Sequence, residues 1–353
     1  AAGVAFMLVV ALRRYLREKG WFEGRPQPDV RTLLDIVAVA TVADMVPLEK
    51  TNRTLVTAGL REMAKGNRVG LQALLKVSKV DPLRVSSSDL GFRVGPRINA
   101  RGRLSHAGAA VDLMLTQDPE LALNLSESLD GANRERREIQ DQAVIEATES
   151  LTEENIEQTA SLVLSNPSWH PGVLGLIASK LVNRYNRPAI VIGEGGKGSA
   201  RTISGLDIHA AINSASHHLE RFGGHKAAAG LTIREECFPQ FKDEFEQAVR
   251  DALGAPPFVP TLAPDLEVDA NQLNLKMVDE LEELGPFGQK NPEPLLFSRN
   301  VPVCGSRIVG STHLKLNLGQ QGVDAIAFGM AEHRGTLPYM IDIAYRIERN
   351  VFR

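Results

Sequence analysis

One aspartate near the start of the chain lies where it can do chemistry. Residues 33–46 form a dense apolar run rich in Val, Ala and Ile, and Asp44 lies close to its end. A carboxylate beside buried surface needs an arginine, backbone donors or a metal ion. Because carboxylates bind hard divalent ions, Asp44 is a candidate metal ligand. The alternatives are that Asp44 caps the next helix or pairs with Arg53.

An arginine-rich stretch, Gly-Pro-Arg-Ile-Asn-Ala-Arg-Gly-Arg-Leu, is a second candidate. An arginine fork matches two phosphate oxygens at once, so such a cluster suits an anion. The glycines favour a loop, and we expect an anion-contacting loop that uses Arg97, Asn99 and Arg101. The structural alternative pairs the same arginines with Asp89, Asp112 or the carboxyl ends of helices.

Glycines also surround a third polar cluster. Gly193, Gly195 and Gly198 satisfy the G-x-G-x-x-G pattern of dinucleotide-binding folds. That pattern must open a helix at once, whereas the residues that follow are extended in character. The sequence also has no Gly-Lys-Ser or Gly-Lys-Thr, which the phosphate loop of nucleotide hydrolases requires. Two interpretations stay open: a flexible hairpin, or a phosphate site made by Ser199, Arg201 and exposed backbone N–H groups.

The fourth cluster is Gly223-Gly224-His225, followed by a run of alanines. Small residues let a backbone approach another group closely, and a histidine there can contact a phosphate, ligate a metal or orient a base. His170 lies in a similar setting, Trp-His-Pro-Gly, ahead of a helix whose amino end suits anions. Several phosphate contacts without a nucleotide-hydrolase loop are typical of a polynucleotide track.

The elements that position these clusters follow from apolar spacing. It predicts helices at residues 4–18, 54–65 (with Asn52 as a cap), 71–77, 88–94, 107–115 and, long and polar, 119–153. Strands at 161–164, 189–192 and 227–233 then alternate with helices at 173–185, 208–219 and 241–253. This alternation predicts a small α/β domain. His217 and His218 lie in one of these helices and are interpreted as surface residues.

A linker rich in proline and glycine follows at residues 254–264. Beyond it, short strands are expected at residues 307–309, 313–318, 323–328 and 339–346. Such strands suit a small β-barrel of the oligonucleotide-binding type.

Composition narrows the class of protein. The 353 residues, 43% hydrophobic and 24% charged, indicate a globular protein of two or three domains and exclude a disordered or membrane chain. The net charge of −3 gives no global attraction to nucleic acid, so a local basic groove must provide it. Cys237 and Cys304 match no metal spacing and, without a secretory signal, predict a reducing cytoplasm.

The order of the motifs resembles that of RecJ, in the DHH phosphoesterase superfamily. The matching stretches are Thr-Val-Ala-Asp-Met-Val-Pro-Leu at 41–48, Pro-Arg-Ile-Asn-Ala-Arg-Gly-Arg-Leu at 96–104, Trp-His-Pro-Gly-Val at 169–173, Gly-Ser-Ala-Arg at 198–201, Phe-Gly-Gly-His at 222–225 and Leu-Gly-Pro-Phe-Gly-Gln-Lys-Asn-Pro at 284–292. Two residues depart from the family pattern. Arg101 stands where alanine is usual, and Lys290 stands where glycine is usual.

The resemblance implies a single-stranded-DNA-specific 5′→3′ exonuclease of DNA repair and recombination. By it, Asp44 is a catalytic ligand of a Mn²⁺ or Mg²⁺ pair, and His225 is catalytic near the scissile phosphate. Ser199 and Arg201 would bind the 5′-terminal phosphate. Further contacts to phosphate or DNA are expected from Arg97, Asn99, Arg101, His170, Gly223 and Gly224.

The resemblance also implies an α/β architecture of four parts. They are the C-terminal part of a DHH domain (1–117), a connecting helix (118–155), a DHH-associated α/β domain (156–255) and an incomplete oligonucleotide-binding barrel (262–353). The chain starts without methionine and ends directly after a strand-like segment, so we expect a piece of a longer protein. The Asp-x-Asp, third acidic and Asp-His-His motifs expected before Asp44 are not found there. We therefore expect this chain to bind DNA without cleaving it.

Two other functions stay open. One is a phosphodiesterase of short oligonucleotides or cyclic dinucleotides, although those relatives generally lack a barrel-like region. The other is a non-catalytic single-strand-binding scaffold related to RecJ. The partners implied are single-stranded DNA, single-strand-binding protein and a RecQ-type helicase. A cytoplasmic monomer without membrane contact is expected.

Overall fold

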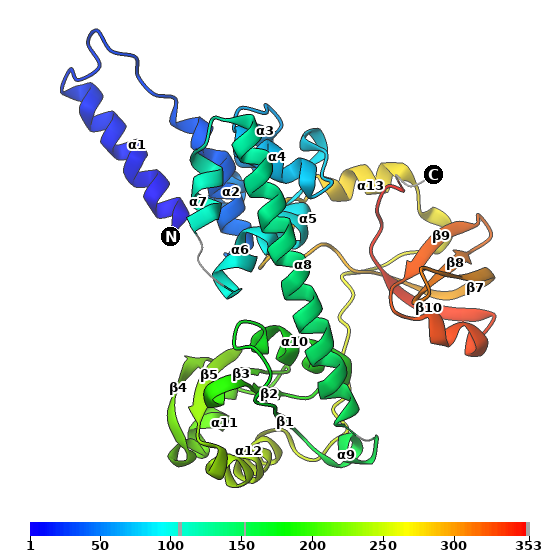
Figure 1. The fold of residues 1–353 in the computed structure, drawn as a ribbon. Coiled ribbons are helices and arrows are strands. Elements are labelled where there is room, and N and C mark those ends of the chain that lie inside the picture. Colours follow the sequence, from blue (N-terminus) through cyan, green and yellow to red (C-terminus); the bar gives the residue numbers. More distant parts are fainter. Residues whose placement is uncertain (105–107, 152, 351–353) are drawn as a thin grey trace. The chain divides into compact units, whose positions relative to one another are not determined.

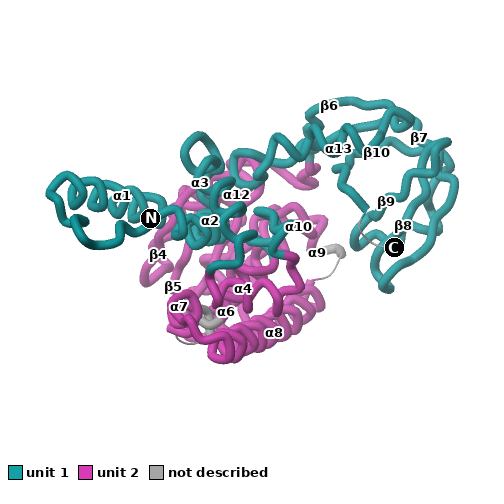
Figure 2. The backbone as a smooth tube through the Cα atoms, turned by 90° about the horizontal axis from the view of Figure 1, so that it is seen from above, with its two compact units in different colours: residues 1–67, 82–92, 261–353 teal, residues 68–81, 93–260 magenta. Residues whose placement is uncertain are grey.

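A computed structural model describes residues 1–104, 108–151 and 153–350, except for the side chains of residues 101, 103, 104 and 153–155. The chain forms two compact units (Figure 2). The first unit comprises Ala1–Asn67, Pro82–Phe92 and Thr261–Arg353, and the second comprises Arg68–Asp81 and Arg93–Pro260. No helix in the described ranges is long and apolar enough to cross a membrane.

The first unit begins with helices. They are α1 (Ala2–Glu18), η1 (Val30–Leu33), α2 (Leu34–Ala43), α3 (Lys50–Met63), η2 (Pro82–Arg84) and α5 (Ser87–Asp89). Apolar side chains of α1, α2 and α3 form one core. A β-carbon on Gly59 would lie 2.2 Å from the carbonyl oxygen of Leu34, so this glycine lets α2 and α3 approach closely. The cap expected at Asn52 is wrong, because α3 starts earlier and Asn52 donates to the Pro47 carbonyl (3.0 Å).

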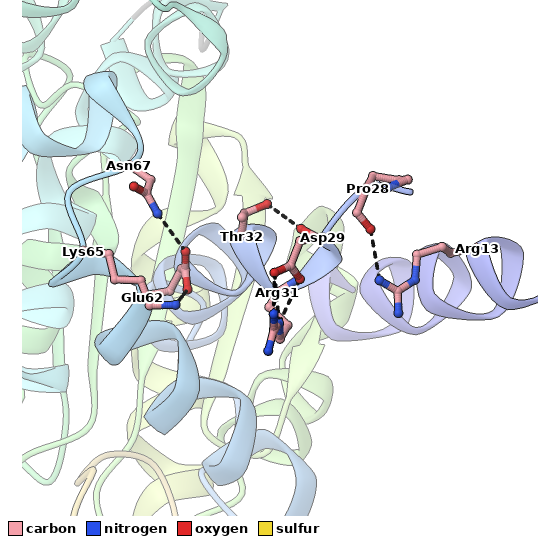
Figure 3. A network of polar contacts seen from close by, with 8 residues as sticks. All are labelled: Arg13, Pro28, Asp29, Arg31, Thr32, Glu62, Lys65 and Asn67. Atoms are coloured by element: carbon pink, nitrogen blue, oxygen red, sulfur yellow. Dashed lines mark hydrogen bonds and ion pairs between the residues drawn. The ribbon is translucent and has the colours of Figure 1, made fainter. Parts of the chain in front are cut away.

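Polar contacts fix the connection between α1 and α2 (Figure 3). Arg13 of α1 donates to the carbonyl of Pro28 (3.0 Å). Asp29 then accepts the backbone N–H of Arg31 (3.0 Å) and pairs with its guanidinium group (2.7 Å). Asp29 is therefore the N-cap of η1, and it orients the start of α2.

The first unit also contains a curled antiparallel sheet (Figure 1). The order is β10-β7-β8-β9, from β7 (Leu296–Val309), β8 (His313–Leu318), β9 (Val323–Ala327) and β10 (Met340–Tyr345). β6 (Leu266–Glu267) pairs with β7, and η7 (Ala270–Gln272), α13 (Leu275–Glu282) and η8 (Ala331–Thr336) complete this part. β7 is much longer than the expected strand at 307–309, because it pairs first with β10 and then with β8.

The segment that leads into this sheet is anchored to α3 and its surroundings. Arg53 donates to the carbonyls of Leu284 (2.6 Å) and Gly285 (2.9 Å). The N–H of Leu48 donates to the carbonyl of Gln289 (2.7 Å). Arg53 is thus occupied by backbone carbonyls, and its expected alternative pairing with Asp44 is not formed.

The second unit starts with three helices that pack around a fourth, the long helix α8. They are α4 (Val69–Val77), α6 (Gly95–Leu104), α7 (Gly108–Leu115) and α8 (Pro119–Glu149), and the π-helix η3 (Leu90–Val94) directly precedes α6. The expected loop at residues 95–104 is therefore wrong. Gly95 and Pro96 occupy the first turn of α6, directly after the π-helical turn η3.

The remainder of the second unit is an α/β domain (Figure 1). Its sheet has the order β1-β2-β3-β5-β4, from β1 (Leu162–Ser165), β2 (Ala189–Ile192), β3 (Lys197–Arg201), β4 (Leu219–His225) and β5 (Ala228–Ile233). β1 and β2 are parallel and the other pairs are antiparallel. The other elements are α9 (Glu153–Gln158), α10 (Leu174–Tyr185), η4 (Glu194–Gly196), α11 (Ile208–Ser214), η5 (Ser216–His218), η6 (Glu235–Cys237) and α12 (Phe238–Leu253).

The two faces of this sheet differ. One face packs on α11 and α12 in a core that includes Phe241 and Phe245. On the opposite face, α10 and α8 pack over β1 and β2 through Leu162, Ala189 and Val191, and α10 also contacts β3. The helix expected at 208–219 ends at Ser214, because the residues from Leu219 onward pair with β5 instead.

Candidate functional site

The adjacent strands β3, β5 and β4 place nine residues in a grid on the same face of the sheet as α10. Residues paired directly across strands point to the same face, as do residues two apart along a strand. The three rows are Lys197-Thr232-Arg221, Ser199-Gly230-Gly223 and Arg201-Ala228-His225, each read in the order β3, β5, β4. We call these nine residues the open face.

The open face has basic corners and a small centre. Lys197, Arg201, Arg221 and His225 occupy the corners, and Gly230 is the middle residue. With strands about 4.8 Å apart and about 6.8 Å for every two residues, the corners enclose about 10 by 14 Å. None of the nine residues is acidic. A flat surface of this charge and size suits an anionic chain laid across it.

One edge of the open face meets the start of α10. A β-carbon on Gly175 would lie 2.7 Å from Nη2 of Arg201 and 3.0 Å from Oγ of Ser199, so both side chains lie against this first turn. Arg201 also donates through Nη1 to Oγ of Ser199 (3.2 Å) and to the carbonyl of Ala200 (2.8 Å). The N-cap residue Val173 provides no side-chain cap. The first N–H groups of α10 therefore add to Ser199 and Arg201 as donors for an anion.

His170 precedes this helix with a defined ring orientation. Its Nδ1 accepts the backbone N–H of Gly172 (3.0 Å), so in the neutral ring the proton lies on Nε2. The segment is held by Trp169, whose indole N–H donates to Glu146 of α8 (2.8 Å). Hydrogen bonds from Gln142 and Trp169 lower the pKa of Glu146 and keep it ionised as an acceptor. His170 thus presents a donor before the amino end of α10.

The glycine-rich stretch before β3 is a hairpin turn. A β-carbon on Gly193 would lie 2.2 Å from the Trp169 carbonyl oxygen, and one on Gly196, where φ is 66°, would lie 2.0 Å from that of Ile233. These glycines are required by the packing of the turn. The hairpin interpretation and the phosphate-site interpretation are thus compatible, because Ser199 and Arg201 lie on the strand that follows.

Gly223 and Gly224 differ in their surroundings. A β-carbon on Gly224, where φ is 156°, would lie 2.5 Å from the Ala228 carbonyl oxygen. A β-carbon on Gly223 would meet nothing within 4 Å. Gly224 is therefore a requirement of the fold. Gly223 lies on the exposed open face, where it leaves room for a bound group.

Among the described side chains of α6, Arg97 is occupied by structural contacts. Arg97 pairs with Asp130 of α8 (2.9 Å), and only 13% of its side chain is exposed. Arg97 therefore forms a structural ion pair, as the alternative to phosphate binding predicts, but its partner is Asp130 and not Asp89 or Asp112. Asn99 is exposed on α6, whereas the side chain of Arg101 lies outside the described part of the structure.

Asp44 follows the last turn of α2. Its side chain is exposed, whereas the sequence predicts a carboxylate beside buried surface. In the described part of the chain its carboxylate has no hydrogen bond or ion pair, and Glu49, not Asp44, is the N-cap of α3. A carboxylate at the negative end of a helix favours a nearby cation, which fits a metal ligand. However, the described residues include only one group of three possible metal donors, and Asp44 is not among them. One carboxylate cannot hold a metal pair.

Lys197 and Arg221 were not identified from the sequence. The signal was present in the period-two spacing Lys-x-Ser-x-Arg and Arg-x-Gly-x-His, which places each set on one face of a strand. That the two sets share a face depends on the pairing of both strands with β5.

Comparisons with known proteins agree with this architecture. The DHHA1 domain model matches residues 158–251 and the RecJ OB domain model matches residues 264–353. The single-stranded-DNA-specific exonuclease RecJ of Dickeya dadantii is 38% identical over 371 residues, which cover 99% of this chain and 64% of that protein. The RecJ of Thermus thermophilus is 33% identical over 351 residues, covering 99% of this chain and 49% of that protein.

Solved structures give the same result. Crystal structures of Thermus thermophilus RecJ in complex with Mg²⁺ and with Mn²⁺ match this chain with TM-scores of 0.84 and 0.85, both at 32% identity. The matches cover 99% of this chain and 53% and 50% of those chains. The expected α/β fold with a DHH-associated domain and an oligonucleotide-binding sheet is confirmed. This chain contains the DHHA1 and RecJ OB domains of RecJ proteins, and it spans less than two thirds of the length of the curated RecJ relatives that it matches.

Proposed function

We propose that this chain is the strand-binding part of a single-stranded-DNA-specific 5′→3′ exonuclease of DNA repair and recombination. The observation that carries the proposal is the open face, with its basic corners, in contact with the donors at the start of α10. The similarity to RecJ exonucleases over 99% of the chain supports it. The match to the RecJ OB domain favours a polynucleotide over a dinucleotide as substrate.

In this proposal the 5′-terminal phosphate lies at the start of α10. Arg201, Ser199 and the first N–H groups of the helix donate to its oxygens, which fixes the end of the strand. The following nucleotides lie on the open face, where Lys197 and Arg221 neutralise backbone charge. His225 is about 10 Å from Arg201, two strand spacings away, and donates to a phosphate further along. A fixed 5′ end would set the direction of cutting.

A divalent ion, Mn²⁺ or Mg²⁺ as in the Thermus thermophilus structures, would supply an activated water and charge neutralisation. Asp44 would provide one ligand. Because the described residues bring no second acidic or imidazole ligand set to Asp44, we propose that this chain binds DNA but does not cleave it alone. Efficient release of nucleotides by the purified chain with Mn²⁺ would show that this part of the proposal is wrong.

The test of the 5′-phosphate site is a binding experiment. Fluorescence anisotropy compares two identical single strands, one with a 5′-phosphate and one with a 5′-hydroxyl group, on the chain and on Arg201→Ala. We expect a preference for the phosphate that Arg201→Ala removes, since a charged hydrogen bond contributes about 1.5–3 kcal/mol, or about tenfold to a hundredfold.

Arg234→Ala is the matched control. It removes an exposed arginine that lies after β5, off the open face, and pairs with Glu236. It should retain the preference. Equal binding of both strands by the folded parent chain would instead favour a scaffold that contacts only the DNA backbone.

The expected division into domains at residues 1–117, 118–155, 156–255 and 262–353 remains part of the proposal, as do a cytoplasmic location and a monomeric state. Single-strand-binding protein and a RecQ-type helicase are the partners we propose to test. Co-purification of each with the chain is the direct measurement.

A further inference from the structure

Two histidines that the sequence analysis interpreted as surface residues lie beside a carboxylate. His217 and His218 form the end of η5, and their rings are 4.0 Å apart between centroids. Glu244 of α12 faces both rings, with its oxygens 3.4 Å from Nε2 of His217 and 3.1 Å from Nε2 of His218. These three residues are the one group of three possible metal donors within the described residues, and their ligand atoms all lie within 4.8 Å of one another.

The arrangement is not explained by ion pairs alone. Nε2 of His218 is buried and makes no hydrogen bond of acceptable geometry to any described residue, although a Glu244 oxygen is within reach. A buried polar nitrogen without a partner is costly and calls for a ligand.

We propose that His217, His218 and Glu244 form a binding site for a borderline transition-metal dication, of which Zn²⁺ is the best representative. Zn²⁺ binds imidazole nitrogen and carboxylate oxygen at about 2.0–2.2 Å, so ligand atoms of a tetrahedral site are about 3.3 Å apart. Small side-chain rotations bring the three donors to that spacing. Water would complete the coordination, because His217 and Glu244 are exposed. Imidazole ligands disfavour Mg²⁺ and Mn²⁺ at this position.

The proposed metal site lies where it can link the start of β4 to α12. η5 runs directly into β4, which is the edge strand of its sheet and contains Arg221, Gly223 and His225 of the open face. Glu244 belongs to α12, which packs on the opposite face of that sheet. A metal bound here links the start of β4 to α12 and restrains an edge strand that has β5 as its single neighbour. The inference does not depend on the proposed nuclease activity.

The experiment uses the full chain after removal of metals with a chelator. Isothermal titration with ZnCl₂ measures the affinity, and amide hydrogen exchange with and without Zn²⁺ measures protection at residues 219–225. The variants are His217→Ala and Glu244→Gln. His333→Ala is the matched control, because His333 forms a surface pair with Glu332 (3.8 Å) without a second histidine.

We expect one Zn²⁺ site whose affinity falls more than about a hundredfold in either variant, since loss of a ligand costs more than the tenfold to hundredfold of an outer-shell change. The control should bind as the parent does. Zn²⁺ should also slow amide exchange in β4 of the parent but not of the variants. Absence of binding, or binding that both variants retain, would overturn the site. Binding without added protection in β4 would overturn the link to the edge strand.

Discussion

Gly175 and Arg201 lie in direct contact, because a β-carbon on Gly175 would be only 2.7 Å from Nη2 of Arg201. The glycine in the first turn of α10 thus leaves the space that the guanidinium group occupies. The contact links the amino end of a helix to the strand β3 that contains the proposed phosphate ligands.

Gly175→Ala should therefore displace the end of Arg201 without disrupting the fold. The flexible guanidinium group can move, and alanine favours a helix over glycine by about 0.5–1 kcal/mol. We expect the preference for a 5′-phosphate to fall about tenfold while the thermal unfolding midpoint stays unchanged or rises. Gly131→Ala in α8 is the control, because its β-carbon would meet nothing within 4 Å. An unchanged preference in Gly175→Ala would contradict the role of Arg201.

Alanine substitutions at the adjacent glycines of β4, Gly223 and Gly224, should affect DNA binding and stability separately. Gly223→Ala adds a methyl group to the open face and should weaken binding of single-stranded DNA by about 1–3 kcal/mol, as overpacking of a contact does. Gly224→Ala forces a clash with Ala228 and should instead lower the free energy of unfolding by a similar amount. Anisotropy and urea unfolding on both variants test this. Loss of stability in Gly223→Ala would show that the open face is misassigned.

The basic corners of the open face predict a change in salt dependence. Lys197→Ala and Arg221→Ala each remove one expected phosphate contact. Each should reduce the slope of log K against log salt by about 0.7, the value for one contact to a single strand. Binding isotherms between low and physiological salt measure the slope. A slope equal to that of the parent in both variants would place the DNA elsewhere.

Lys290 has a positive φ of 60° in the segment that Leu48 and Arg53 anchor. A residue with a β-carbon costs about 1–2 kcal/mol in this conformation, and glycine does not. Lys290→Gly should therefore raise the free energy of unfolding by about 1 kcal/mol. Chemical denaturation compares it with Lys290→Ala, which retains the β-carbon and should gain nothing. An equal gain in both variants would indicate that charge, not backbone conformation, is responsible.

The cap at Asp29 predicts a pH dependence (Figure 3). The hydrogen bonds from Arg31 lower the pKa of Asp29 from 3.8 to about 2. A lowered carboxyl pKa stabilises the fold above the unfolded value, and this stabilisation is lost as the pH falls through about 2. Asp29→Asn should destabilise the chain modestly at pH 7, and the difference should shrink below pH 4. A difference that is constant from pH 7 to pH 2.5 would exclude the charge of Asp29 as its cause.

The order of helices and strands was largely predictable because apolar spacing is local. The strand predicted at residues 189–192 and the helix predicted at residues 241–253 are both confirmed within a few residues. The loop predicted at residues 95–104 is wrong, although glycine and proline have low helix propensity. Packing of α6 on the long helix α8 overrides their weak helix propensity.

The candidate site was predictable only in parts. Ser199, Arg201 and His225 were identified as separate motifs, but their common face depends on β3 and β4 both pairing with β5. Such pairing joins residues distant in sequence, and spacing along one strand does not reveal it. The proximity of Glu244 to His217 and His218 also could not be predicted, because these residues are distant in sequence.

The small side chains at the centre of the open face bear on whether the chain can distinguish one DNA sequence from another. Gly230, Ala228 and Gly223 offer no side-chain donors or acceptors to the edges of bases. Base identity is read by such groups, whereas phosphate contacts report only position. A single strand bound on this surface is held through its phosphates and not through its bases, so the affinity of the chain for single strands should depend little on base sequence.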